Sequence, residues 1–159
     1  MSSLERNDLT GLIQAISSAV ASDSLQAPFT QAQWDALAPY LTSVELAAGE
    51  VLFPAGTQDR NLFVVESGNL SVHYLDSKEK VHLTIIGPGA LLGEGAFFAH
   101  RPRRVTVQAA SGCRLWCLTS LRFTELSNRN PALALALVMA MGQVLAKRAT
   151  DSRKRLAST

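Results

Sequence analysis

The chain has 159 residues and a net charge of +2, with 47% hydrophobic and 18% charged residues. Its length suits about one domain, and its composition excludes an intrinsically disordered chain, which combines low hydrophobicity with high charge. The longest unbroken apolar run, residues 132–141, has ten residues. A membrane-spanning helix needs about 20, so no membrane span is expected. The polar, acid-containing start of the chain is unlike a signal or transit peptide, which makes the cytoplasm the expected compartment.

Charge is distributed unevenly along the chain. The net charge is −2 over residues 1–30, −5 over residues 31–100 and +9 over residues 101–159. Such asymmetry indicates an anionic partner for the last third. Its bases concentrate in two clusters, at 101–104 and at 147–155. For the second cluster, a solvated basic face is an equally good interpretation.

The sequence offers little for metal or catalytic chemistry. Cys113 and Cys117 lie four apart in a predicted strand, so their Cα atoms are about 13 Å apart at ~3.3 Å per residue, whereas a disulfide needs about 5.5 Å. Buried free thiols are predicted. His73, His82 and His100 lack metal-ligand spacing, and an iron–sulfur cluster wants about four cysteines. We expect no metal, no cofactor and no enzymatic activity.

Two helices are predicted before residue 42. Apolar residues recur at helical spacing over residues 8–22; they are Leu9, Leu12, Ile13, Ile16 and Val20. After a loop, Thr30 and Gln33 have the spacing of a capping box that starts a second helix. Pro39 should distort or end that helix, because proline cannot donate a backbone hydrogen bond.

The central part of the chain has the pattern of short strands. Runs rich in Val, Ile, Leu, Phe and Tyr alternate with turn residues such as Gly, Pro, Asn and Asp. Seven or eight strands at this spacing indicate an antiparallel sandwich or jelly roll. The predicted strands are 44–46, 51–53, 62–65, 70–74, 81–86, 105–109 and 113–118.

A short helix is predicted over Ser120 to Ser127, and a longer one over residues 131–156. Asn130 serves as the N-cap of the longer helix and Pro131 is its first residue. Its apolar residues form two stripes, one of Leu133, Leu137, Ala140 and Val144 and another of Leu135, Val138, Met139 and Leu145. A helix that is apolar on all sides must be buried on all sides. One stripe can pack on the strands, and the other predicts a homodimer through the same helix of a second copy.

Residues 87–107 carry the chemistry. In Gly93-Glu94-Gly95-Ala96, small residues let the backbone approach a ligand, and free N–H groups at the start of a helical turn attract an anion. Arg103 follows, and the planar fork of an arginine can donate two hydrogen bonds to a phosphate. A carboxylate near a phosphate is tolerable where it accepts hydrogen bonds from a ribose hydroxyl. The segment therefore predicts a sugar-phosphate pocket.

Gly-Glu-x-Ala, a short apolar turn and then Pro-Arg-x-x-Thr-Val resemble the phosphate-binding cassette of the cyclic nucleotide-binding domain family. That family includes the bacterial catabolite activator protein, protein kinase A regulatory subunits and cyclic-nucleotide-gated channels. The similarity extends over about residues 30–150 and includes Gly49, Gly56, Gly68, the 62–68 hairpin and the Asn130-Pro131 helix start. It implies a mainly β fold with flanking α, an antiparallel β-roll (jelly roll) with N-terminal helices and a long C-terminal helix. Residues 1–29 are then an N-terminal helical extension and residues 30–159 the cyclic nucleotide-binding domain.

The resemblance also implies roles for single residues. Glu94 would bind the ribose 2′-hydroxyl and Arg103 the cyclic phosphate. The implied ligand-binding residues are Gly93, Glu94, Gly95, Ala96, Phe97, Arg103, Arg104, Val105 and Thr106. Two departures stand out: Gly95 replaces a larger apolar residue, and Arg104 replaces a small or hydroxylated one. Arg104 either points outward or adds a second charge, and a register in which Arg104 itself holds the phosphate stays open.

The function expected is a stand-alone cyclic mononucleotide sensor, with the C-terminal helix closing over the purine as a lid. Arg148 or Thr150 would be the lid residue. Cyclic AMP is expected rather than cyclic GMP, because the threonine that favours guanine in some members is absent after Arg103. Only about ten residues follow Arg148, too few for a helix-turn-helix, so no sequence-specific DNA binding is expected. The alternatives are a nucleotide-free interaction module or a fragment of a larger regulator or channel; the downstream protein partner is unknown.

Overall fold

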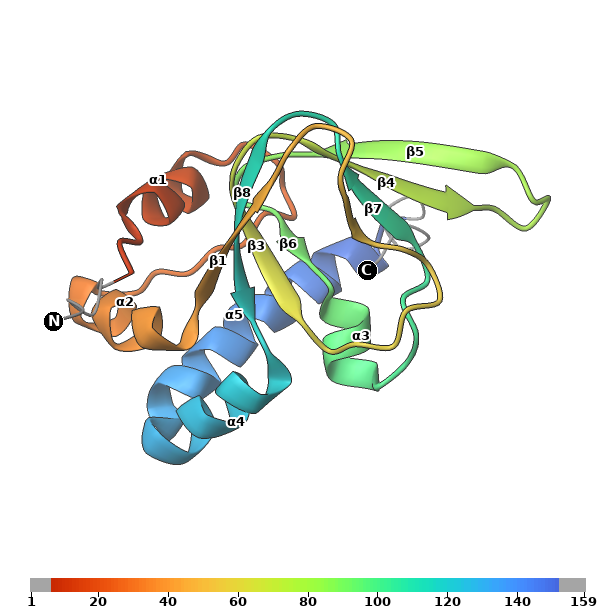
Figure 1. Ribbon diagram of the computed structural model, residues 1–159. Helices are drawn as coiled ribbons and strands as arrows, with labels where there is room; N and C mark the ends of the chain where they lie inside the picture. The colour runs from red at the N-terminus through yellow and green to blue at the C-terminus, as the bar shows by residue number, and fades with distance from the viewer. Residues whose placement is uncertain (1–6, 152–159) are drawn as a thin grey trace, which may run out of the picture.

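A computed structural model describes residues 7–151 of the chain. Its centre is a β-roll of two four-stranded antiparallel sheets, flanked by helices (Figure 1). Two helices precede the strands, one short helix interrupts them, and two follow them. The prediction of a jelly roll with N-terminal helices and a long C-terminal helix is confirmed.

Seven of the eight strands follow the predicted runs, with ends that differ by at most two residues. One sheet has the order β1 (Thr42–Leu46), β8 (Cys113–Leu118), β3 (Leu62–Ser67) and β6 (Leu91–Leu92). The other has the order β2 (Val51–Phe53), β7 (Thr106–Ala109), β4 (Leu70–Leu75) and β5 (Val81–Ile86). The sequence pattern did not predict β6, because two residues are too few to show alternation.

Three of the five described helices directly follow an N-cap residue whose side chain accepts a hydrogen bond from the first turn. The five helices are α1 (Thr10–Ser18), α2 (Gln31–Leu37), α3 (Glu94–Ala99), α4 (Ser120–Arg129) and α5 (Pro131–Ala149). At the start of α2 the Thr30 hydroxyl accepts a hydrogen bond from the Gln33 amide at 3.2 Å, and the Gln33 side chain accepts one from the Thr30 amide at 2.8 Å. The predicted capping box is therefore present. Pro39 ends α2 in a 3₁₀ turn, η1 (Ala38–Tyr40).

The first helix is shorter than predicted. It covers nine residues rather than residues 8–22, and Val20, assigned to its apolar stripe, lies beyond its end and is fully exposed. Leu12 and Ile16 are buried in a core that also holds residues of α2, β3, β8 and α5. The N-terminal extension thus packs into the same hydrophobic core as the strands.

The last helix also ends earlier than predicted, at Ala149 instead of residue 156. The Thr150 amide and hydroxyl both donate to the Lys147 carbonyl, at 3.3 and 2.8 Å, and this tight turn ends the helix. Residues 152–156 lie outside the described part of the chain. At the other end, Asn130 accepts from the Leu133 amide at 3.2 Å, as its N-cap role predicts.

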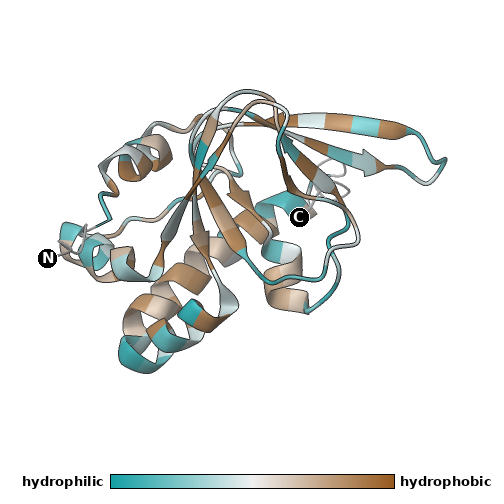
Figure 2. Cartoon of the chain, viewed as in Figure 1, coloured by the Kyte–Doolittle hydropathy of each residue, from teal (hydrophilic) through white to brown (hydrophobic). Residues whose placement is uncertain are grey.

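The two apolar stripes of α5 have different surroundings. The stripe of Leu133, Leu137, Ala140 and Val144 is buried in the core. On the other side, Leu135 is 64% exposed and Met139 61% exposed. Hydrophobic residues run along the helix up to its polar last turn (Figure 2). By length and composition α5 could cross a membrane, a test that a core helix also passes.

Candidate functional site

The Gly93–Phe97 segment forms the start of α3. Gly93 is the N-cap and has a left-handed backbone, with φ at +87°. A Cβ atom there would lie 2.5 Å from the Asn61 carbonyl oxygen and 2.6 Å from Nη1 of Arg103. Only glycine fits without a shift of neighbouring atoms. Glu94 and the three residues that follow it are buried, so the predicted short helical turn exists and faces inward.

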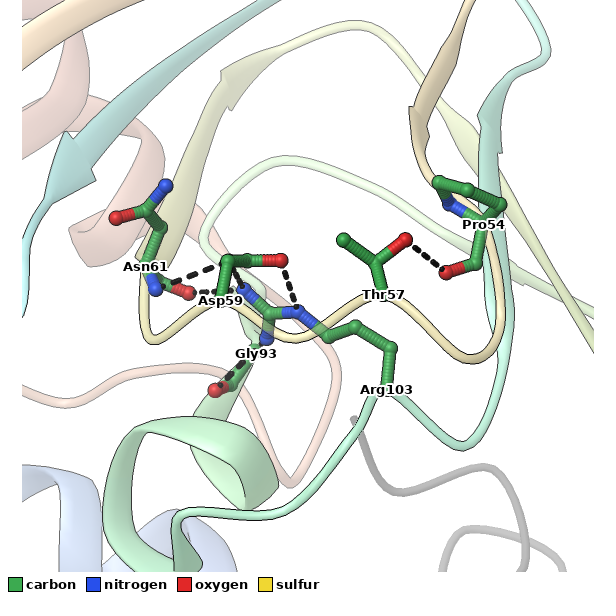
Figure 3. Close-up of polar contacts among 6 residues, drawn as sticks. All are labelled: Pro54, Thr57, Asp59, Asn61, Gly93 and Arg103. Atoms are coloured by element: carbon green, nitrogen blue, oxygen red, sulfur yellow. Dashed lines mark hydrogen bonds and ion pairs between the residues drawn. The ribbon is translucent and has the colours of Figure 1, made fainter.

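Arg103 lies between α3 and β7 and reaches across to the segment that connects β2 and β3 (Figure 3). Its Nε donates to Asp59 Oδ2 at 3.1 Å, and its Nη2 forms an ion pair with Asp59 Oδ1 and donates to the Asn61 carbonyl at 2.6 Å. Its Nη1 donates to the Gly93 carbonyl at 3.1 Å. The guanidinium carbon lies 4.1 Å from the centroid of the Phe53 ring.

These contacts occupy most of the binding capacity of Arg103. A guanidinium has five N–H donors, and protein oxygens accept from four of them. Within the described residues one Nη1–H is left beside α3. In this structure the carboxylate of Asp59 accepts from Nε and Nη2, the two-donor edge that the sequence pattern predicts for a phosphate. The sequence held no signal for Asp59, since only the fold brings it to Arg103.

Glu94 is fully buried and is also paired. Nη1 of Arg148 donates to Glu94 Oε1 at 2.7 Å, its Nη2 donates to the Leu91 carbonyl at 2.8 Å, and its Nε donates to Asp23 Oδ2 at 3.0 Å. Burial alone would lower the pKa of Arg148, but the carboxylates of Glu94 and Asp23 outweigh it and raise this pKa above its usual value. Arg148, the predicted lid residue of α5, is thus hydrogen-bonded to Glu94, the residue predicted to bind the ribose.

The other predicted site residues differ in burial. Arg104 is exposed, next to the buried Arg103, which fits the outward orientation for Arg104. Val105 is buried between the sheets, and the Thr106 hydroxyl accepts from the Ala55 amide at 3.0 Å. Thr150 is exposed and bonded to Lys147, so it does not contact the site as Arg148 does.

A cavity of about 290 Å³ opens beside Arg148. Its apolar wall comes from β4, β5 and β6 and includes Val72, Ile86 and Leu92. Glu94 and Arg103 do not line the cavity themselves. Arg148 lines the cavity and donates a hydrogen bond to Glu94. The buried Glu94 carboxylate therefore lies directly behind the end of the cavity that Arg148 forms.

The charge asymmetry of the sequence is partly neutralised inside the molecule. Arg103 pairs with Asp59, and Arg148 pairs with Asp23 and Glu94. Both bases belong to the basic last third, and all three acids belong to the acidic first part. The excess of positive charge left for an external anionic partner is therefore smaller than the sequence suggests.

Both cysteines are free and buried, as predicted. Burial raises the pKa of Cys117 to about 11, Asp59 adds to this, and Arg103 opposes it. Within the described residues, no group of three or more His, Cys, Asp or Glu side chains is arranged to hold a metal ion.

Known proteins share both the sequence pattern and the fold. A cAMP-dependent protein kinase regulatory subunit of Eremothecium gossypii is 28% identical over 117 residues, which cover 72% of this chain and 24% of the relative. Patatin-like phospholipase domain-containing protein 7 of Rattus norvegicus is 28% identical over 96 residues, 59% of this chain and 7% of the relative. The chain thus spans less than a quarter of the length of either curated relative.

Two solved structures have a similar fold. A cyclic nucleotide-binding domain from Methylobacillus flagellatus has a TM-score of 0.79 at 17% identity and covers 92% of this chain and 80% of its own. The N-terminal domain of a transcriptional regulator from Streptomyces coelicolor has a TM-score of 0.68 at 28% identity, over 80% of this chain and 91% of its own. The model of the family described as "Cyclic nucleotide-binding domain" matches residues 43–130, more than half of the chain. By its sequence pattern, its β-roll and this match, the chain belongs to the cyclic nucleotide-binding domain family.

Proposed function

We propose that this chain is a cyclic mononucleotide sensor whose ligand lies between α3, the β4–β5 hairpin and the end of α5. The observation that carries the proposal is the position of Arg148, which lines the cavity and bonds the buried Glu94. Glu94 would accept from the ribose hydroxyl, and the apolar wall would take the purine. A volume of about 290 Å³ is near the lower end of the about 300–1,000 Å³ typical of ligand sites.

The phosphate would lie at the start of α3. There the Arg103 guanidinium donates to the Gly93 carbonyl, and amides in the first turn of a helix have no acceptor within the helix. Both the guanidinium charge and the amide donors would favour a negatively charged group near the start of α3. We infer cyclic AMP as the preferred ligand, because Arg104 stands where a guanine-binding threonine is found in other members.

A path from the ligand to α5 runs through aromatic contacts. Phe97 of α3 packs edge-on against Phe123 of α4, with ring centroids 5.4 Å apart. Helix α4 leads directly into α5 through Asn130. A phosphate that draws α3 inward would move Phe97, shift α4 and reposition α5, which changes the balance between two states of the lid.

The second candidate is a nucleotide-free interaction module on the same fold. One observation favours it: both predicted ligand side chains, Glu94 and Arg103, already have protein partners. Under this hypothesis the ion pairs of Glu94 and Arg103 only stabilise the fold, and the cavity binds no nucleotide in the cell.

Titration calorimetry with cyclic AMP and cyclic GMP separates the two candidates. We expect heat of binding for the wild type and about tenfold to hundredfold weaker affinity for Glu94→Gln, because a hydrogen bond to a charged group contributes about 1.5–3 kcal/mol. Glu125→Gln, the same change at a half-exposed acid on α4 outside the cavity lining, is the control and should bind like the wild type. No heat with either nucleotide at millimolar concentration would favour the interaction module.

We further propose that α5 pairs with α5 of a second copy. The exposed residues Leu135, Met139, Gly142 and Ala146 are spaced by four, three and four positions and form one stripe along the helix. Such spacing suits a two-helix seam. Leu135→Glu is expected to convert a dimer to a monomer in sedimentation velocity, since it would bury a charge in the seam. Lys147→Glu, exposed on the same helix but about 100° around it from Ala146, should leave the dimer intact. A monomeric wild type would contradict the proposal.

A further inference from the structure

The loop between α1 and α2 forms one side of the cavity. Val20, Ala21, Asp23 and Ser24 line it together with apolar residues of β4 and β5. The Leu25 amide of this loop donates to the Gly89 carbonyl at 2.9 Å, which attaches the loop to the turn between β5 and β6. The N-terminal extension therefore contributes to the wall of the cavity.

The end of α1 packs closely on the turn that carries Gly89. That glycine has φ at +86°, and a Cβ atom there would lie 2.7 Å from Cβ of Ala19 and 3.1 Å from the Ala15 carbonyl oxygen. The turn connects β5 to β6, and β6 leads through Gly93 into α3. The loop is thus attached to the same stretch of chain that presents Glu94.

Asp23 connects this loop to α5 across 125 positions of the sequence. Its Oδ2 accepts from Nε of Arg148 at 3.0 Å, and the two side chains are 14% and 8% exposed. Arg148 also bonds Glu94 and the Leu91 carbonyl. One guanidinium therefore joins the N-terminal loop, the strand before α3, the first residue of α3 and the last turn of α5.

We propose that residues 20–25 are a second lid over the nucleotide cavity and that Asp23 is the positioning residue that holds Arg148 against Glu94. The inference rests on the proposed function, since it assigns a role in closing the same cavity. The guanidinium of Arg148 donates to acceptors on several sides, and each of these charge-assisted hydrogen bonds restricts its orientation. Without Asp23, Nε would be a buried donor without its carboxylate, and Arg148 would lose the contact that turns it toward α3.

This arrangement makes ligand and loop mutually dependent. A nucleotide that binds the closed arrangement stabilises the Asp23–Arg148 contact, and by thermodynamic linkage that contact strengthens nucleotide binding by the same factor. The N-terminal extension therefore reports occupancy of the cavity alongside α5. A partner that bound the extension only when the loop was closed would read the ligand without contacting it.

The test uses the full chain and cyclic AMP titrations. We expect Asp23→Ala to weaken cyclic AMP binding about tenfold, the loss of one charge-assisted hydrogen bond. Asp23→Asn, which keeps an acceptor oxygen but no charge, should recover part of that loss. Asp35→Ala removes an exposed acid on α2 and should bind like the wild type. Affinity that is unchanged or tighter in Asp23→Ala would overturn the proposal.

Two further measurements test the role of Asp23 separately from nucleotide binding. In a double-mutant cycle of Asp23→Ala and Arg148→Ala, urea unfolding should show clear coupling between the two sites. Hydrogen exchange of residues 19–25 should slow when cyclic AMP binds the wild type and change little in Asp23→Ala. If the two substitutions have strictly additive effects on the free energy of unfolding, the proposed role of Asp23 is wrong, while the proposed function is unaffected. The same holds if cyclic AMP does not change the hydrogen exchange of residues 19–25. A wild type that binds neither nucleotide overturns the proposed function, and the second lid with it, even where the cycle shows coupling.

Discussion

Replacing Arg103 with alanine is expected to cause one of the two largest losses of stability among single changes at the site. The side chain is fully buried and holds Asp59, the Asn61 carbonyl and the Gly93 carbonyl. Removing one partner of a buried ion pair costs about 3–5 kcal/mol, because the other is left without its counter-charge. Asp59 is 26% exposed, so water can compensate in part, and about 3 kcal/mol is the better expectation. Urea unfolding followed by circular dichroism measures it.

Arg104→Ala is the matched control, since it deletes the same side chain at the exposed neighbouring position. Its effect on the free energy of unfolding should stay within about 0.5 kcal/mol. Arg103→Lys tests binding in a chain that keeps the charge: lysine lacks the planar fork that contacts three partners at once, so cyclic AMP affinity should fall steeply. If Arg104→Ala abolishes binding and Arg103→Lys does not, the alternative register, with Arg104 on the phosphate, is correct.

Gly93→Ala is expected to destabilise the chain by about 3 kcal/mol and to disturb the site directly. A left-handed backbone costs an L-residue about 1–2 kcal/mol. The added methyl group would also lie 2.5 Å from the Asn61 carbonyl oxygen and 2.6 Å from Nη1 of Arg103, closer than van der Waals contact allows. Since Arg103 bonds the Gly93 carbonyl, relief of the clash must move the guanidinium, and cyclic AMP affinity should fall as well.

Gly49→Ala separates the two causes. Gly49 has φ at +90° and nothing within 4 Å of the position its Cβ atom would take. Its replacement should therefore cost only the backbone strain, about 1 kcal/mol, and leave nucleotide affinity unchanged. Urea midpoints and calorimetric titrations of the two variants give the comparison. Equal losses of stability would mean that the α3 start yields to the methyl group and that Gly93 is not sterically required there.

Local chemistry explains why most of the fold could be predicted. The strands β2, β5 and β8 have the predicted bounds because apolar runs end at turn residues. Helices α2 and α5 begin directly after Thr30 and Asn130 because each of these residues caps the helix that follows it. Hydrophobic periodicity did not predict the ends of helices that lack a terminating residue such as glycine or proline. Val20 continues the apolar pattern of α1 yet lies outside it, and α5 ends at a tight turn that no glycine or proline announces.

The sequence by itself determined the β-roll, the buried turn at Gly93–Phe97 and the family, because these depend on neighbours in the chain and on motif spacing. Tertiary structure alone decided the partners of the two charged side chains of that motif. Asp59 meets Arg103 and Arg148 meets Glu94 only because sheets and helices bring them together, and a buried charge must find a counter-charge wherever the fold supplies one. Such pairings leave no periodic trace in a sequence, since nothing near either residue depends on them.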